Sequence, residues 1–252
     1  MSLGSFCLVL HGHLPYVLRH GTWPHGEDWL YEAAAETYLP ILATLHECDY
    51  LEATPRITIG LTPVLLEQLA HEDFKNGFEV YLRDRLDRAA SDRKEFEGCG
   101  EEHFAHLAGM WERFYEQCAD QFAEIGRNIP RAYAECARRG WVEILTSSAT
   151  HAYLPLLYED SSVAAQLRAG VATSEKILGF KPTGVWLPEC AYRPPGPWYA
   201  PISWGHPRDR SGTERFVVDE GLTHFFVENQ LVEHSRSEWV HNEGWHKVDW
   251  EE

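Results

Sequence analysis

Short apolar runs alternate along the chain with longer stretches in which apolar residues recur at helical spacing. Continuous apolar runs of this length are typical of strands buried on both faces of a parallel sheet. The pattern therefore predicts about five strands, at residues 5–10, 56–61, from 141, 183–188 and 223–229.

Helical spacing fills the segments between these runs. It covers residues 28–48, where Pro40 is expected to kink the helix or to begin a second one, because proline cannot donate a backbone hydrogen bond. Another helix is predicted from a cap at Ser161 to about Leu178, where Gly179 can end it in a left-handed conformation. Strands that alternate with helices indicate an α/β fold with a parallel sheet, either open or curled into a barrel.

Residues 73–139 are charged and helical, without a clear strand, and we expect an inserted helical layer. Pro130 suits the first turn of one of its helices, and Gly140 suits the end of that helix. One apolar stripe runs along the segment and consists of Phe104, Leu107, Ala108, Trp111, Phe114, Cys118 and Phe122. Residues 233–252 show neither the helical nor the strand period of apolar residues. We therefore expect one unit over 1–232 followed by an irregular tail.

Composition narrows the class of function. The 252 residues include 39 acidic and 22 basic side chains, for a formal charge of -17. Such a charge repels phosphate backbones and anionic lipid, so we expect neither a nucleic-acid nor a membrane partner. No apolar run approaches the length of a membrane span, and the amino terminus lacks the features of a signal peptide. Six widely spaced cysteines without a C-x-x-C pair indicate reduced thiols and a cytoplasmic location.

Polar side chains follow each predicted strand, where the functional groups of α/β folds collect. The strand ends carry His11, His13 and Tyr16; Thr62 and Pro63; Ser147, Ser148 and His151; Glu189, Cys190 and Tyr192; Glu228 and Asn229.

The histidines among these residues allow three interpretations. His11 and His13, two residues apart on an extended chain, point the same way and could join His151 in a metal site. They could equally bind sugar hydroxyls, or satisfy backbone groups in a turn.

Glu189 is the carboxylate with the fewest structural reasons to be where it is. It directly follows an apolar strand, and Trp186, Tyr192, Trp198 and Tyr199 surround it in the sequence. An acid among aromatic rings resembles the nucleophile of a retaining glycosidase, which needs a second carboxylate about 5 Å away. Glu228 is the candidate for that partner on the next strand, although acids at strand ends are common.

Cys190 offers a different chemistry, because a cysteine paired with His151 could act in acyl transfer. Nothing in the sequence marks an oxyanion hole, and there is no glycine-rich phosphate loop. We therefore rank this interpretation below sugar chemistry.

Three motifs taken together resemble a known family. They are "HGHLPY" at 11–16, "ITIGLTPVLLEQL" at 57–69 and "GVWLPECAYRPPGPW" at 184–198. Their order, spacing and strand-end positions resemble glycoside hydrolase family 57, and within it the α-1,4-glucan branching enzymes. The resemblance covers roughly residues 5–232.

The resemblance implies a distorted (β/α)7 barrel, an α-glucan such as amylose or a glycogen-type polymer as the partner, and no metal or organic cofactor. By this resemblance Glu189 is the nucleophile that forms a glycosyl-enzyme intermediate, and the reaction cleaves α-1,4 bonds and forms α-1,6 branches. The substrate-binding residues are then expected to be His11, His13, Tyr16, His151, Trp186, Cys190 and Tyr192.

The sequence departs from the family in one respect. The family's acid/base is an aspartate in a downstream region that nothing here matches, and after Val232 we expect the resemblance to end. On this basis we expect an incomplete, truncated barrel that is inactive or nearly so by itself, since general acid–base catalysis contributes about 10²–10⁴-fold. Its uncovered strand edges would favour self-association.

Overall fold

The computed structural model describes residues 4, 6–199, 208–229, 238–241 and 244–247, and all structural statements below refer to these residues. Its centre is a set of parallel strands. They are β1 (Val9–Gly12), β2 (Ile57–Leu61), β3 (Val142–Leu145), β4 (Gly184–Val185) and β7 (His224–Phe225).

These strands pair side by side in the order β1-β2-β3-β4-β7. β2 lies between β1 and β3, and β4 pairs with β7, all in parallel register. A single parallel bridge between Thr146 and Val185 joins the two groups. The predicted α/β sheet of about five parallel strands is therefore confirmed, in an arrangement that forms part of a barrel.

The strands are shorter than the apolar runs, and the first is displaced. The run at 5–10 predicted a strand that ends before the histidines, whereas β1 covers Val9–Gly12 and includes His11. The reason is the register, because β1 pairs only where β2 lies opposite it, from Val9 with Thr58 to Gly12 with Leu61.

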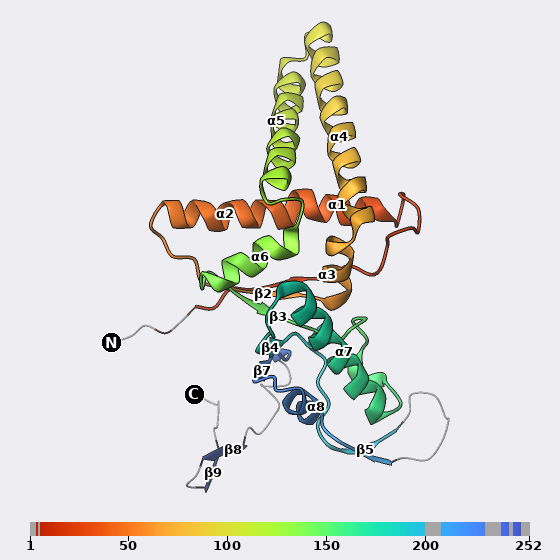
Figure 1. The fold of residues 1–252 in the computed structure, drawn as a ribbon, viewed down its shortest axis with the longest axis vertical. Helices are drawn as coiled ribbons and strands as arrows, with labels where there is room; N and C mark the ends of the chain where they lie inside the picture. Colours follow the sequence, from red (N-terminus) through yellow and green to blue (C-terminus); the bar gives the residue numbers. More distant parts are fainter. Residues whose placement is uncertain (1–3, 5, 200–207, 230–237, 242–243, 248–252) are drawn as a thin grey trace.

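One long helical rod follows β1. It consists of α1 (Glu27–Ala33), a π-helical turn at Ala34–Tyr38 and α2 (Leu39–Tyr50), and it appears as a nearly continuous horizontal rod in Figure 1. Pro40 lies in the first turn of α2, so the prediction that it begins a second helix is confirmed. The π turn before it accommodates the missing N–H of the proline without a sharp kink.

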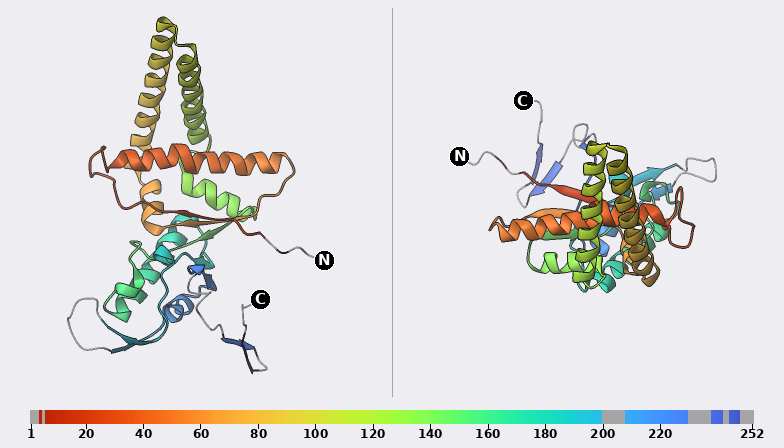
Figure 2. Two further views of the ribbon diagram at one scale, coloured as in Figure 1. Left: turned by 180° about the vertical axis from the view of Figure 1, so that it is seen from behind. Right: turned by 90° about the horizontal axis from the view of Figure 1, so that it is seen from above.

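The predicted helical insertion contains α4 (Glu72–Cys99), α5 (Glu102–Glu124) and α6 (Ile129–Arg138), after the short α3 (Pro63–Ala70). Figures 1 and 2 show α4 and α5 as a hairpin that projects away from the sheet, whereas α6 lies beside the sheet and leads into β3. The predicted helical insertion is therefore present, with α6 beside the sheet and α4 and α5 as a projecting hairpin.

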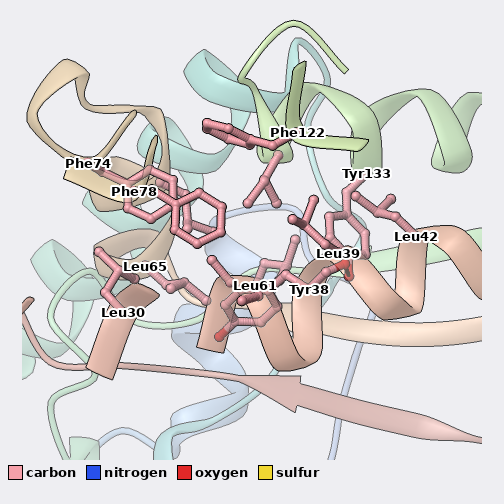
Figure 3. Packing of buried hydrophobic residues seen from close by; sticks show 14 of the residues in the cluster. Leu30, Tyr38, Leu39, Leu42, Leu61, Leu65, Phe74, Phe78, Phe122 and Tyr133 are labelled. Carbon is pink, nitrogen blue, oxygen red and sulfur yellow. Dashed lines mark hydrogen bonds between the residues drawn. The ribbon is translucent and has the colours of Figure 1, made fainter. Parts of the chain in front are cut away.

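A main core fills the space between the rod, the base of the hairpin and the sheet. Phe74 and Phe78 of α4 meet Phe122 of α5 there, with Phe78 and Phe122 in an edge-to-face contact at 4.9 Å between ring centroids. Figure 3 shows these rings beside Tyr38 and Tyr133. Burial of such apolar side chains is the main source of stability in this half of the chain.

A second, smaller core lies under β4 and β7, between α7 (Asp160–Leu178) and α8 (Thr213–Asp219). α7 ends at Gly179 in the left-handed conformation, as predicted. Its beginning differs from the prediction: Glu159 occupies the cap position and Ser161 lies inside the first turn. Ser161 is not the cap because the helix begins one residue earlier, at Asp160.

Two antiparallel hairpins were not predicted. β5 (Gly196–Trp198) pairs with β6 (Arg208–Arg210), and β8 (Glu238–His241) pairs with β9 (Gly244–Lys247). The second lies within the segment expected to be irregular, which is wrong for those residues. The β5–β6 hairpin contains prolines and the β8–β9 hairpin contains charged residues. Both interrupt the alternation of apolar and polar residues by which a strand is recognised in a sequence.

Candidate functional site

The carboxyl ends of the parallel strands bring the predicted site residues to one edge of the sheet. His11 lies in β1, Thr62 follows β2, His151 follows β3 and Glu189 follows β4. Because all these strands run in the same direction, segments that are far apart in sequence meet at this edge. The contacts between their side chains define the site.

Three histidines form a compact group. The rings of His13 and His151 stack with centroids 3.7 Å apart and planes 14° apart. Nε2 of His11 lies 3.2 Å from Nε2 of His151, a hydrogen bond in which one ring donates and the other accepts. The sequence prediction that these three side chains lie together is consistent with this geometry.

His11 fits closely against β2. A Cβ atom at position 60 would lie 2.9 Å from Nδ1 of His11, so only glycine leaves room for the ring. The same Nδ1 atom is buried and has no hydrogen-bond partner among the described residues. An unpaired acceptor is less unfavourable there than an unpaired N–H group, which favours the tautomer with the proton on Nε2.

This tautomer determines the state of His151. If Nε2 of His11 donates to Nε2 of His151, the proton of His151 lies on Nδ1. That atom is 4.0 Å from Oε1 of Glu189. The N–H group of His151 therefore lies near the carboxylate, at a distance longer than a direct hydrogen bond.

His13 is held by a different set of contacts. Its Nδ1 lies 3.2 Å from Oγ1 of Thr62, the residue before α3. The loop that follows His13 is fixed by the buried Gln68, whose side-chain oxygen accepts from the backbone N–H of Val17 at 2.7 Å and whose amide donates to the carbonyl of Pro15 at 3.0 Å. The motif after β2 therefore supports the motif after β1.

Burial keeps the histidines neutral. It lowers the pKa of His11 to about 4, and the nearby His151 and His13 contribute to that shift. Burial and His151 also lower the pKa of His13 to about 4, with Glu189 opposing the shift. The pKa of His151 shifts in the same direction through burial. At neutral pH the group can therefore donate and accept hydrogen bonds without carrying charge.

Glu189 lies in a strained turn. It belongs to a single 3-10 turn, Pro188–Cys190, in which Glu189 has φ 56° and Cys190 has φ 51°. Left-handed conformations cost about 1 kcal/mol or more for residues with a Cβ atom, and strain of this kind is concentrated at functional sites. The side chain of Glu189 is 71% exposed, so the carboxylate is accessible to a ligand from solvent.

Trp186 was predicted to bind substrate, and the structure places it beside the histidines. His11 stacks against it with centroids 4.6 Å apart, and Phe226 stacks against it at 5.7 Å. Trp186 is intermediate in burial, so part of its surface is exposed. It supports His11 by stacking, and its role in substrate binding remains a prediction.

Phe226 did not emerge from the sequence as a site residue. Its position directly after β7, in the run that predicted that strand, could have indicated that it faces the same edge as Trp186. An apolar residue in a predicted strand carries no chemical signal that distinguishes it from the core.

The structure describes no contact between Tyr16 or Tyr192 and the histidine group. Tyr16 is exposed and meets the edge of His20 at 6.0 Å. Tyr192 stacks on Phe225 at 5.7 Å, and burial and a hydrogen bond with Glu214 raise the pKa of its phenol to about 12. Their roles in substrate binding remain predictions.

Cys190 does not have the environment of a nucleophile. Burial raises the pKa of its thiol, and the negative charges of Glu228 and Glu189 raise it further. A reactive cysteine needs the opposite shift. Glu228, the candidate second carboxylate, follows β7, the strand that pairs with β4.

The donor geometry does not favour a metal site. His13 and His151 stack face to face, so the lone pairs in their ring planes do not converge on one point. Within the described part of the chain, no three His, Cys, Asp or Glu side chains are grouped as a metal ion requires. The three-histidine metal interpretation therefore has no geometric support.

A partial parallel barrel with a carboxylate, histidines and aromatic rings at its carboxyl edge defines a class, the barrel-type glycoside hydrolases. Comparison with known proteins defines the family within it. The profile of Glycosyl hydrolase family 57 matches residues 7–246, and the chain belongs to this family. The match extends past residue 232, so the expectation that the resemblance ends there is wrong.

Individual relatives are branching enzymes. The chain is 40% identical over 240 residues to the 1,4-alpha-glucan branching enzyme TK1436 of Thermococcus kodakarensis, covering 95% of this chain and 34% of that protein. The crystal structure of TK1436 in complex with glucose and additives superposes with a TM-score of 0.83 at 37% identity, covering 96% of this chain and 44% of that one.

A second solved structure is that of the branching enzyme of this family from Pyrococcus horikoshii. Its TM-score is 0.86 at 40% identity, over 90% of this chain and 42% of that chain. The chain thus spans less than half the length of the relatives that it matches.

No helix in the described part of the chain is long and apolar enough to cross a membrane.

Proposed function

We propose that the chain carries the nucleophile side of a glucan-branching site, at which an α-1,4 bond is cleaved and the released chain is transferred to a 6-hydroxyl. The observation that carries the proposal is the position of Glu189, an exposed carboxylate in a strained turn at the strand edge, 4.0 Å from His151. The similarity to TK1436, a branching enzyme whose crystal structure was determined in complex with glucose, supports it.

In the first half of the reaction, an oxygen of Glu189 attacks the anomeric carbon of a glucosyl unit. The bond from that carbon to the leaving oxygen breaks, and the leaving oxygen takes up a proton from an acid. In the second half, the 6-hydroxyl of an acceptor chain attacks the anomeric carbon, loses its proton to the conjugate base and releases Glu189.

The chain's own residues have defined parts in this proposal. The Nδ1–H group of His151 faces the carboxylate, and the neutral His13 binds a hydroxyl of the donor sugar. The neutral His11 lines the donor-sugar site and holds His151 through its Nε2 atom. Tyr16, Cys190 and Tyr192 complete the proposed substrate-binding set, with Trp186 acting through His11. The proton donor is not among them, so we propose that the 252 residues alone do not branch amylose.

Covalent trapping tests the nucleophile without a proton donor. With 5-fluoro-α-D-glucosyl fluoride, attack by Glu189 breaks the C–F bond and fluoride leaves as an anion, so no acid is needed. We expect mass spectrometry to find one fluoroglucosyl group on the peptide that contains Glu189, and none in Glu189→Gln.

Two outcomes of this experiment would contradict the proposal. Equal labelling of Glu189→Gln would place the nucleophile elsewhere, for instance at Glu228. Binding of maltooligosaccharides by calorimetry without any labelling of the unsubstituted chain would leave a carbohydrate-binding unit that is not catalytic.

Two further parts of the proposal concern the product and the cellular setting. We infer that the product is a glycogen-type polymer. We also infer that the chain acts in the cytoplasm, because all six cysteines are free. Cell fractionation checks the location. We also propose that β1, which is an edge strand among the described residues, permits self-association, which sedimentation velocity at several concentrations measures.

A further inference from the structure

The strained turn at Glu189 needs support on both sides, since left-handed residues persist only where the surrounding structure determines them. On the β4 side the support is clear. The N–H of Trp186 donates to the carbonyl of Thr146 at 2.8 Å, and Oγ of Ser147 donates to the carbonyl of Trp186 at 2.8 Å. The segment before Glu189 is thus tied to β3.

The segment after Glu189 is tied to the chain at Arg193. The N–H of Thr213 donates to the carbonyl of Arg193 at 2.9 Å, and the N–H of Arg193 lies 3.3 Å from Oγ1 of Thr213. The guanidinium of Arg193 donates to the carbonyl of Ser211 at 2.6 Å. The turn is therefore held between β3 and the residues that lead from β6 into α8.

One carboxylate joins these contacts. Oδ1 of Asp160, the first residue of α7, accepts from Nε of Arg210 at 2.6 Å, and Oδ2 accepts from the N–H of Ser211 at 3.2 Å. The guanidinium of Arg193 lies 3.9 Å from the same Oδ1. Asp160 is thus shared by two arginines and by the backbone segment that receives the Arg193 side chain.

Charge makes this carboxylate hard to replace. The side chain of Arg210 is 2% exposed and that of Arg193 is 14% exposed. Burial, together with the positive charge of Arg210, lowers the pKa of Arg193, while the negative charge of Asp160 opposes that shift. Without the charge of Asp160, the buried Arg210 and the largely buried Arg193 lose a shared partner, and Glu214 is the other acidic residue whose charge acts on Arg193.

We propose that Asp160 is a positioning residue for Glu189, acting through Arg193 and Arg210 to hold the far side of the Pro188–Cys190 turn. The inference rests on the proposed function, in which Glu189 is the nucleophile. It assigns a role in the reaction to an ion cluster that contacts neither the carboxylate nor the histidine group. Its expected effect is on how fast Glu189 attacks, through the geometry of the turn.

The test measures trapping by 5-fluoro-α-D-glucosyl fluoride as a function of reagent concentration. This measurement gives two quantities for each variant: the trapping rate constant at saturating reagent and the reagent concentration at which the rate is half of that maximum. Both are corrected for the fraction of molecules that is folded. We expect Asp160→Asn to lower the saturating rate constant at least tenfold. Asp219→Asn is the matched control, because it also removes the charge of an arginine-paired aspartate but on the exposed side of α8, and it should trap at the original rate.

A purely structural role for Asp160 would give a different result. It would lower the melting temperature and the folded fraction, while folded molecules would trap at the original rate, and this would overturn the inference. Arg193→Lys, with Arg215→Lys as its control, provides the same test if Asp160→Asn does not fold. Absence of trapping in the unsubstituted chain would instead contradict the proposed function.

Discussion

At the scale of single residues, the site depends on close contacts that leave little freedom to its side chains. His11 lies between Gly60 and Trp186, and its Nε2 atom forms a hydrogen bond with Nε2 of His151. The nucleophile candidate lies 4.0 Å from Nδ1 of His151, in a turn that favours glycine. Several of the residues that matter most for this geometry, such as Gly60, have no reactive group.

Gly60→Ala tests this packing. The added methyl group would lie 2.9 Å from Nδ1 of His11, so the ring must move, and overpacking of this kind costs about 1–3 kcal/mol. We expect urea denaturation to show a loss of that size together with slower trapping at Glu189. Gly98→Ala in α4, where no atom lies within 4 Å of the added methyl, should instead be neutral or stabilise the chain by up to about 1 kcal/mol. Equal effects of the two changes would contradict the packing argument.

At the scale of elements, the α4–α5 hairpin shows where the apolar stripe is buried and where it is not. Ala108, Cys118 and Phe122 of the stripe are buried, whereas Phe104, Leu107 and Trp111 are exposed. The buried end is next to the rod, and the exposed end extends away from it toward the tip of the hairpin (Figure 1). Helical period predicts one apolar face, but only the length of the neighbouring elements determines how much of it is covered.

Phe122→Ala and Phe104→Ala measure the difference between the two ends. Phe122 is 1% exposed and contacts Phe74 and Phe78, so its truncation should cost about 3–5 kcal/mol. Phe104 is 51% exposed, and its truncation should change the unfolding free energy by less than about 1 kcal/mol. Chemical denaturation checks both, and a large cost at Phe104 would indicate that this face is covered in solution.

At the scale of the whole molecule, buried neutral histidines make stability depend on pH. The pKa of His11 and of His13 falls from 6.5 in the unfolded chain to about 4 in the folded one. Between these values the unfolded chain binds more protons, so the unfolding free energy decreases as the pH falls from 6.5 toward 4. The histidines thus stabilise the fold only while they are neutral.

Denaturation at about pH 7 and about pH 5 tests this dependence. We expect a loss of about 1 kcal/mol or more for each of the two histidines at the lower pH. His11→Gln should reduce the loss, because one titrating group is removed, whereas His103→Gln at the exposed start of α5 should not. The same pH dependence in all three proteins would show that other groups cause it.

The sequence by itself determined the approximate places of the five parallel strands, the helical segments and the residues at the strand ends. Apolar runs must be buried, Pro130 restricts the backbone, and Gly140 and Gly179 adopt left-handed conformations that other residues rarely take, so these features need only local information. The three motifs at 11–16, 57–69 and 184–198 together identified the family, which the profile match confirmed.

Tertiary structure decided the rest, because it depends on contacts between distant segments. The register with β2 placed His11 inside β1, and β1 and β7 brought His11 and Phe226 to Trp186. The contact between Asp160 and Arg210, which we propose supports the left-handed turn at Glu189, joins side chains that are 50 residues apart in the sequence. No local pattern encodes such a contact, because burial and charge determine it only once the chain has folded.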